Sequence, residues 1–196
     1  MNIKPKSSIT GIILTGGISR RMGKDKAFMK LGNKYFIEIA ISVMSELCDE
    51  ILISTNIQNY DNFGYRTVID EIPGMGPIGG IYSCLIKSKN EHNLIIPVDT
   101  PFIKKEVYEQ ILLWKNEFQH IVAVNYDQLP EPLHACYHKD LAEILKRFIM
   151  MKNYKIQEIS KHIGTKFVPI NKSLDFFSDD LFLNVNEESD MRKIMR

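Results

Sequence analysis

The residues best suited to chemistry are gathered in one short loop, Leu14–Lys26, whose sequence is LTGGISRRMGKDK. The adjacent glycines Gly16 and Gly17 allow a sharp turn and let backbone N–H groups approach a ligand closely. Four cations follow in the same loop: Arg20, Arg21, Lys24 and Lys26. Exposed N–H groups and fixed positive charge both favour anions, and the loop directly follows an apolar run typical of a buried strand. These features predict a polyphosphate site, and the alternative is a solvated basic loop without a ligand.

The spacing within this loop argues against two common nucleotide-binding motifs. A Walker A loop needs G-x-x-x-x-G-K followed by Ser or Thr, whereas Gly17 and Gly23 are spaced too widely and Lys24 precedes Asp25. The dinucleotide fingerprint G-x-G-x-x-G is also absent. A kinase, a GTPase or an NAD-dependent enzyme therefore loses its main support.

Asp99 is the first of two carboxylates placed where a ligand would be expected. It ends the apolar run LIIPV and is followed by Thr100 and Pro101. A carboxylate projecting from a rigid strand can bind Mg²⁺, which takes one or two carboxylates together with substrate phosphates. Residue chemistry alone leaves a second interpretation equally open, in which Asp99 caps the helix expected near Lys104 or stabilises a turn.

Asp70 is the second carboxylate, and it opens the loop DEIPGMGPIGG. The glycines of this loop permit a close fit and its prolines stiffen it, so it could form a wall against a flat base. The alternative is an ordinary turn that leads into a helix starting near Ile78, with Pro77 at the first helical position.

Apolar strand patterns alternate with helical patterns along the chain, and this alternation predicts how the candidate residues are positioned. Strands are expected over Ile9–Thr15, Glu50–Ser54, Arg66–Asp70, Leu94–Val98, Ile121–Asn125, Leu133–Tyr137 and Lys166–Ile170. Helices are expected over Tyr35–Leu47, Ile78–Lys87, Lys104–Phe118, Asp140–Met150, Lys155–His162 and from Glu187 onward. The β-α-β order predicts an α/β fold with three α/β/α layers and a mostly parallel sheet, in a single domain spanning residues 1–196. Ligands of such sheets lie beyond the carboxyl ends of the strands, where the basic loop, Asp70 and Asp99 all fall.

Bulk composition narrows the classes of partner. The 196 residues carry a formal net charge of +1, which provides no general field for nucleic acid or for an acidic membrane. The three cysteines lie far apart without a C-x-x-C pair, as expected of free thiols in a reducing compartment. No signal peptide or membrane-spanning run is apparent. We therefore expect a cytoplasmic protein without nucleic-acid or membrane partners.

Five sequence blocks resemble those of one known family. LTGGISRRMGKDK is similar to the L-A-G-G-x-S-x-R-M-G-x-D-K loop of the molybdenum cofactor guanylyltransferases, the MobA-like NTP transferases. VIDEIPGMGPIGGI, PVDTPF, EPLHACY and FLNVNEESD resemble further blocks of the family in the same order, so the resemblance covers nearly the whole chain. It implies a Rossmann-like nucleotidyltransferase that transfers GMP from GTP to the phosphate of molybdopterin and releases pyrophosphate.

The resemblance also implies roles for particular residues. Lys26 and Arg21 would stabilise charge on the departing pyrophosphate, and Asp99 would hold Mg²⁺. The residues expected to contact GTP are Leu14, Thr15, Gly16, Gly17, Lys26, Asn56, Asp70, Gly79 and Asp99. EPLHACY would line the pocket for the second substrate. The NVN run from Asn184 to Asn186 would lie near the pterin, unless Asn186 merely caps a terminal helix.

Three alternatives remain open at this stage. A molybdopterin cytidylyltransferase or a sugar-phosphate nucleotidyltransferase would use the same loop and metal. The family's cytidylyl members usually have L-A-A-G where this chain has LTGG, and they depart from its GPIGG, so both points favour guanine. Thr15 stands where the family usually has alanine. A non-catalytic nucleotide-binding module is disfavoured by the joint presence of Lys26, Asp70 and Asp99. Molybdenum-insertion proteins and chaperones of molybdenum enzymes are open candidates for protein partners.

Overall fold

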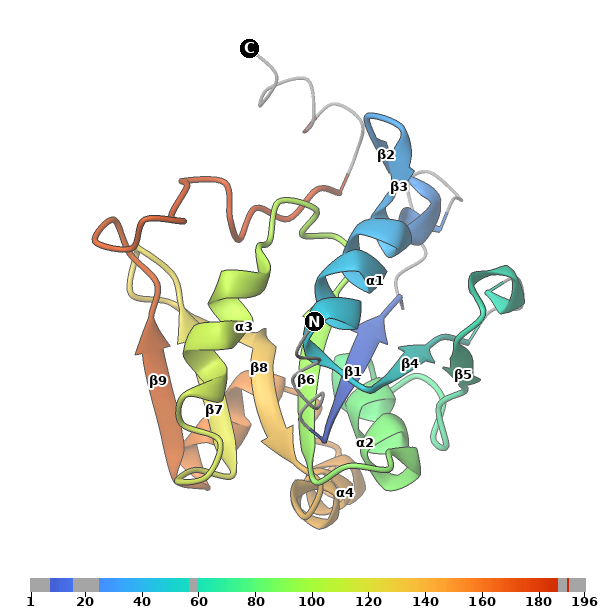
Figure 1. Cartoon of the computed structure of the whole chain (residues 1–196). Coiled ribbons are helices and arrows are strands. Elements are labelled where there is room, and N and C mark those ends of the chain that lie inside the picture. Colours follow the sequence, from blue (N-terminus) through green and yellow to red (C-terminus); the bar gives the residue numbers. More distant parts are fainter. Residues whose placement is uncertain (1–7, 16–24, 57–59, 187–189, 191–196) are drawn as a thin grey trace.

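The computed structural model describes residues 8–15, 25–56, 60–186 and 190, and strands alternate with helices along them (Figure 1). The strands are β1 (Ile9–Leu14), β2 (Lys30–Leu31), β3 (Lys34–Tyr35), β4 (Glu50–Ser54), β5 (Arg66–Val68), β6 (His92–Pro97), β7 (His120–Val124), β8 (Pro130–His138) and β9 (Thr165–Pro169). The α-helices are α1 (Phe36–Leu47), α2 (Pro77–Lys87), α3 (Lys105–Leu112) and α4 (Leu141–Met150). Three short 3-10 helices are η1 (Lys26–Phe28), η2 (Asp61–Phe63) and η3 (Ile156–Lys161).

Seven strands form one sheet in the order β5-β4-β1-β6-β8-β7-β9. The neighbours from β5 to β6 pair in parallel, with Ile12 of β1 opposite Leu52 of β4 on one side and Ile95 of β6 on the other. β8 runs antiparallel to both β6 and β7, whereas β9 is again parallel to β7. The expected mostly parallel α/β sheet is therefore confirmed, with one reversed strand inside it.

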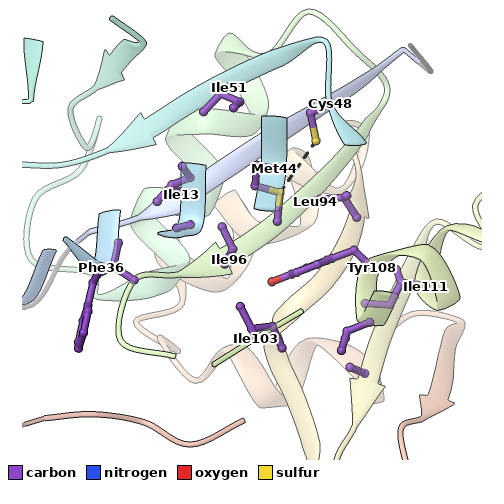
Figure 2. Close-up of a cluster of buried hydrophobic side chains, with 14 of the residues drawn as sticks. Ile13, Phe36, Met44, Cys48, Ile51, Leu94, Ile96, Ile103, Tyr108 and Ile111 are labelled. Atoms are coloured by element: carbon purple, nitrogen blue, oxygen red, sulfur yellow. Dashed lines mark hydrogen bonds between the residues drawn. The ribbon is translucent and has the colours of Figure 1, made fainter. Parts of the chain in front are cut away.

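Helices cover both faces of this sheet, as the three-layer prediction requires. On one face, α1 and α3 contact each other and pack over a cluster that includes Ile13, Ile96 and Tyr108 (Figure 2). On the other face, α2 and α4 contact each other over a second cluster. Strands buried on both sides explain the continuous apolar runs in the sequence, since neither face can be polar.

The close packing of α1 depends on a glycine in β1. A Cβ atom on Gly11 would lie 3.0 Å from Met44 Cβ and 3.1 Å from Cys48 Sγ. Met44 and Cys48 are both fully buried at this contact (Figure 2). Because interiors are close-packed, even one added methyl group would push α1 away from the sheet.

Two expected helices differ in the structure. The α-helix expected over Lys104–Phe118 ends at Leu112, and the chain continues in hydrogen-bonded turns that bring the rings of Trp114 and Phe118 together at 6.2 Å. The α-helix expected over Lys155–His162 is the 3-10 helix η3, in which Ile156 and Ile159 are buried. A spacing of three residues matches the three-residue turn of a 3-10 helix, so this geometry buries both side chains on one side.

One further element was not predicted, and one expected helix falls almost entirely outside the described residues. The sequence pattern did not indicate the β2–β3 hairpin, which turns at Gly32 with φ of 60°. The helix expected from Glu187 onward lies outside the described residues, apart from Asp190.

In the part of the chain that the structure describes, no helix combines the length and the apolar character needed to cross a membrane.

Candidate active site

Three predicted polar residues each follow a parallel strand by two positions, at the same edge of the sheet. Asn56 follows β4, Asp70 follows β5 and Asp99 follows β6. The loop predicted to bind phosphate follows β1, which lies between β4 and β6. The carboxyl ends of parallel strands meet at one edge, so the sheet brings these segments together although they are far apart in sequence.

Lys26 and Asp99 form an ion pair at this edge. Lys26 Nζ lies 3.0 Å from Asp99 Oδ2, and the two side chains are 16% and 24% exposed. Lys26 Nζ also donates a hydrogen bond of 2.5 Å to Asn186 Oδ1. The lysine therefore faces the carboxylate expected to bind the metal, and it remains open enough to solvent to meet a ligand.

The backbone on both sides of this pair is held by hydrogen bonds. Asp99 O accepts from Val185 N at 2.7 Å, and Val98 N donates to Leu14 O at 3.1 Å. Thr100 Oγ1 donates to Pro97 O at 3.2 Å, which closes the turn after β6. The carboxylate thus projects from a tethered turn, and in this structure Asp99 caps no helix, because α3 begins only at Lys105.

Asn56 and Asp70 form a second contact through two reciprocal hydrogen bonds. Asn56 Nδ2 donates to Asp70 Oδ2 at 2.8 Å, and Asp70 N donates to Asn56 Oδ1 at 3.0 Å. Both residues lie just beyond adjacent strands, and Thr55 N donates to Val68 O at 3.0 Å between them. The amide thereby fixes the orientation of a partly buried carboxylate.

The amino end of α2 packs closely against Asp70 because it carries glycines. A Cβ atom on Gly79 would lie 3.0 Å from Met75 Cβ and 3.6 Å from Asp70 Oδ2. A Cβ atom on Gly80 would lie only 2.5 Å from Ser54 Oγ. Pro77 occupies the first turn of the helix, as predicted, and the positive end of the helix dipole favours a carboxylate nearby.

The start of the basic loop lies beside this group. Leu14 and Thr15 are 8% and 3% exposed, and Thr15 Oγ1 donates to Ser54 O at 2.8 Å. Thr15 therefore joins the end of β1 to the end of β4. Three further predicted site residues lie outside the described residues: Gly16, Gly17 and Arg21.

Comparison with known proteins shows the family to which this chain belongs. The sequence pattern of the MobA-like NTP transferase domain matches residues 11–165. This match covers most of the chain and includes Lys26, Asn56, Asp70 and Asp99. The chain belongs to the MobA-like NTP transferase family.

Individual members of the MobA-like NTP transferase family resemble the whole chain. A protein of Natranaerobius thermophilus named "Probable molybdenum cofactor guanylyltransferase" is 31% identical over 95% of this chain and 94% of its own length. A protein of Geobacillus sp. (strain WCH70) with the same name is 27% identical over 96% of this chain and 99% of its own length. These matches agree with the resemblance seen in the sequence blocks.

A solved structure supports the fold of this MobA-like NTP transferase. The molybdopterin-guanine dinucleotide biosynthesis protein A of Archaeoglobus fulgidus superposes with a TM-score of 0.78, covering 94% of this chain and 95% of that one at 24% identity. The expected nucleotidyltransferase fold is therefore confirmed.

The structure gives Asn186 a contact that sequence reasoning left undecided. The sequence allowed either a helix cap or a place near the pterin, whereas the Asn186 side chain reaches Lys26. The segment after β9 runs back across the edge of the sheet that carries the site, which explains this long-range contact (Figure 1). The sequence analysis assigned no role to Asp25, the residue before Lys26. The D-K pair of the family motif was the sequence feature that could have indicated one.

The EPLHACY block forms much of β8, and its histidine is buried rather than exposed to a pocket. His134 is 1% exposed, and its Nδ1 lies 2.8 Å from the Tyr108 hydroxyl. Burial lowers the pKa of His134 to about 3. Glu131 is half-buried, and burial raises the pKa of its carboxyl. A hydrogen bond from Asn125 opposes part of this rise. Of this block, residues 131–133 are the part that solvent partly reaches, whereas residues 134–137 are buried.

Proposed function

We propose that this chain transfers GMP from GTP to the phosphate of molybdopterin, forming molybdopterin guanine dinucleotide and pyrophosphate. The observation that carries this proposal is the Lys26–Asp99 pair at 3.0 Å, at the carboxyl edge of a sheet in a chain of this family. Both curated relatives described above carry the name of this activity.

The reaction requires positioning and charge stabilisation more than covalent chemistry by the protein. An oxygen of the pterin phosphate attacks the α-phosphorus of GTP, and the bond from that phosphorus to the bridging oxygen of the β-phosphate breaks. The electron pair of this bond leaves with pyrophosphate. A phosphate monoester has a second pKa of about 6, so the attacking oxygen is already largely ionised near neutral pH. We therefore assign no general base.

Lys26 is proposed to act on the pyrophosphate that leaves. It is a half-buried cation at the edge where a triphosphate would lie, and a preorganised cation stabilises charge as it develops. Arg21, in the same basic loop, is proposed to assist it. Asn56, Asp70 and Gly79 are proposed to hold the nucleoside, since they form a close-fitting group beyond β4 and β5, separated from Asp99 by the end of β1.

Mg²⁺ is the metal we propose for the site, and the residues present fit it. Among the described residues no cluster of three or more His, Cys, Asp or Glu side chains could hold a metal without a ligand's help. Mg²⁺ commonly binds through one or two carboxylates plus substrate phosphates and water, so the single carboxylate of Asp99 suits it. When bound, the ion would neutralise charge on the phosphates. Lys26 would then exchange its contact with Asp99 for one with phosphate.

The base preference is the feature that separates this proposal from its main alternative. Guanine offers an acceptor and two donors along one edge. We propose that backbone groups of Leu14–Gly17 and Gly76–Gly80 pair with that edge, which requires that no side chain intrude. Cytidylyl relatives usually have alanine where this chain has Gly16. A site that hydrogen-bonds its substrate can reject a mismatched analogue by roughly 10⁴-fold.

Pyrophosphate release in the presence of molybdopterin, measured with GTP and then with CTP, tests the proposal. We expect strong preference for GTP, narrowed by Gly16→Ala combined with changes in the GPIGG run. Equal use of both nucleotides would refute guanylyl transfer and leave nucleotidyl transfer standing. Release without molybdopterin but with a sugar phosphate would favour a sugar-phosphate nucleotidyltransferase. No release under any condition would favour a non-catalytic binding module.

A further inference from the structure

Tyr60 places a buried hydroxyl beside the residue that precedes Lys26. The Tyr60 side chain is 1% exposed, and its hydroxyl donates a hydrogen bond to Asp25 Oδ2. Its ring lies 5.3 Å from the ring of Phe28 and 6.2 Å from that of Phe63. Tyr60 belongs to neither of the polar contacts described above, and the proposed chemistry does not use it.

Asp25 transmits this contact to Lys26 through η1. Its second carboxylate oxygen, Oδ1, accepts a hydrogen bond of 3.0 Å from Ala27 N, so Asp25 caps the 3-10 helix that begins at Lys26. Asp25 O also accepts from Phe28 N at 3.1 Å. One oxygen thus holds the first turn of η1 and the other is held by Tyr60. Because Lys26 is the first residue of that turn, the phenol restrains the backbone from which the lysine reaches Asp99.

The surroundings of the phenol keep it a donor and connect it to the sheet. Burial raises the pKa of Tyr60 above its usual value, the hydrogen bond to Asp25 raises it further, and the nearby hydroxyl groups of Thr15 and Thr55 partly oppose the rise. The hydroxyl therefore stays protonated near neutral pH. Thr15 and Thr55 stand at the ends of β1 and β4, and Thr15 is itself bonded to Ser54 O. Tyr60 thereby lies between η1 and two strand ends of the site.

We propose that Tyr60 is a positioning residue for nucleotidyl transfer, whose hydroxyl fixes Asp25 and thereby holds Lys26 in its working position. The proposal rests on the function proposed above, in which Lys26 stabilises the departing pyrophosphate. The hydroxyl does not touch substrate. Its loss leaves the cation in place and widens the range of positions that the cation samples.

Tyr60→Phe removes the hydroxyl and keeps the ring contacts, so it tests the hydrogen bond alone. We expect kcat to fall about tenfold while the KM for GTP stays within about twofold, because a hydrogen bond to a charged group contributes roughly that much. Hydrogen exchange of the Ala27 amide, followed by NMR, should become about tenfold faster, since the Asp25 cap is loosened. This second measurement needs neither substrate nor turnover.

Tyr35→Phe is the matched control. Tyr35 lies in the same ring cluster, 6.0 Å from Phe28, and the change removes a phenolic hydroxyl that does not contact Asp25. We expect both measurements to stay at their original values in this variant. Asp25→Asn completes a double-mutant cycle, in which Tyr60→Phe should add little to the loss already caused by Asp25→Asn.

The proposal would be overturned by unchanged Ala27 exchange in Tyr60→Phe, or by equal losses of kcat in Tyr60→Phe and Tyr35→Phe. Additive effects of Tyr60→Phe and Asp25→Asn would also overturn it, because they would separate the phenol from the cap. If the unaltered chain transfers no nucleotide, the proposed function fails, and the exchange rates still decide whether Tyr60 restrains η1.

Discussion

The two halves of the central sheet, the strands from β5 to β6 and those from β8 to β9, differ in where their polar residues lie. On the side from β5 to β6, where all strands are parallel, Asn56, Asp70 and Asp99 stand just beyond the strand ends and keep their side chains accessible. On the side from β8 to β9, His120 and His134 lie within the strands and are each 1% exposed. A polar group beyond a strand end can meet a ligand, whereas one inside the sheet is cut off from solvent and depends on partners within the protein. The Nδ1 atoms of His120 and His134 have such partners, Thr165 and Tyr108, whereas the Nε2 atoms of both are buried without one among the described residues.

A polar residue next to or within an apolar run can therefore either meet a ligand beyond the strand or be buried in the sheet. Substitutions at the parallel side should alter kinetics with little effect on folding, and substitutions at the buried histidines should do the reverse. The following predictions test this division, beginning with the largest expected effect.

Asp99→Asn should abolish most turnover while leaving the fold intact. The amide supplies an oxygen but no negative charge, so metal binding would weaken, and loss of on the order of 10³-fold in kcat/KM is expected. Pyrophosphate release at limiting Mg²⁺ measures the effect, and circular dichroism checks the fold. Asp61→Asn, at an exposed position of η2, is the control. Near-normal turnover of Asp99→Asn at limiting Mg²⁺ would contradict the metal assignment.

Lys26→Ala should lower kcat more than it raises the KM for GTP, because the cation acts on charge that develops in the transition state. Loss of one such contact is expected to reduce kcat by about 10²–10³-fold. Steady-state kinetics at saturating Mg²⁺ separate the two parameters. Lys34→Ala, an exposed cation of the β2–β3 hairpin, should leave both unchanged. A change confined to KM would make Lys26 a plain binding residue.

Asn56→Ala should instead raise the KM for GTP, by about tenfold, with little change in kcat. The substitution removes both hydrogen bonds that orient Asp70, and each typically contributes about 1 kcal/mol. The contrast with Lys26→Ala would separate the nucleoside contacts from the phosphate contacts. Asn62→Ala, at an exposed position of η2, is the matched control. A kcat effect as large as that of Lys26→Ala would remove the distinction between the two contacts.

His134→Gln tests the buried side of the comparison through pH. The pKa of His134 is lowered to about 3 in the folded chain, against about 6.5 for an unperturbed histidine, so the unfolded chain binds its proton first as pH falls. Stability is therefore lost as pH decreases from about 6.5 toward 3, at up to about 1.4 kcal/mol per pH unit for this residue.

Urea unfolding between pH 7 and pH 5 should show a shallower loss of stability in His134→Gln than in the unaltered chain, with GTP kinetics preserved. His162→Gln, at an exposed histidine, is the control for the loss of an imidazole. The opposite result, an unchanged slope with a raised KM for molybdopterin, would show that His134 belongs to the second-substrate pocket that the EPLHACY resemblance implied.

Several elements of the fold could be predicted closely because their pattern is local. β4 has the predicted bounds, and α2 begins one residue before the predicted Ile78, with its proline in the first turn. η3 could not be distinguished from an α-helix, since a short segment with two buried isoleucines is compatible with both geometries. The reversed direction of β8 was equally hidden, because its apolar run is buried in either direction.

The amino-acid sequence by itself determined the kind of chemistry and where its residues fall along the chain. Glycines, cations and carboxylates after apolar runs indicate phosphate binding at strand ends, and parallel pairing then brings those ends to one edge. Residue type and spacing carry this information because strands and turns form from short-range preferences.

Only the tertiary structure decided which of these residues meet. The contacts of Lys26 with Asp99 and Asn186 span 73 and 160 positions, and that of Tyr60 with Asp25 spans 35. No local preference encodes such contacts, because they depend on the order of strands in the sheet and on the return of the carboxyl-terminal segment across it. The same packing buried His134 and left Asp99 accessible, although both follow or lie within apolar runs.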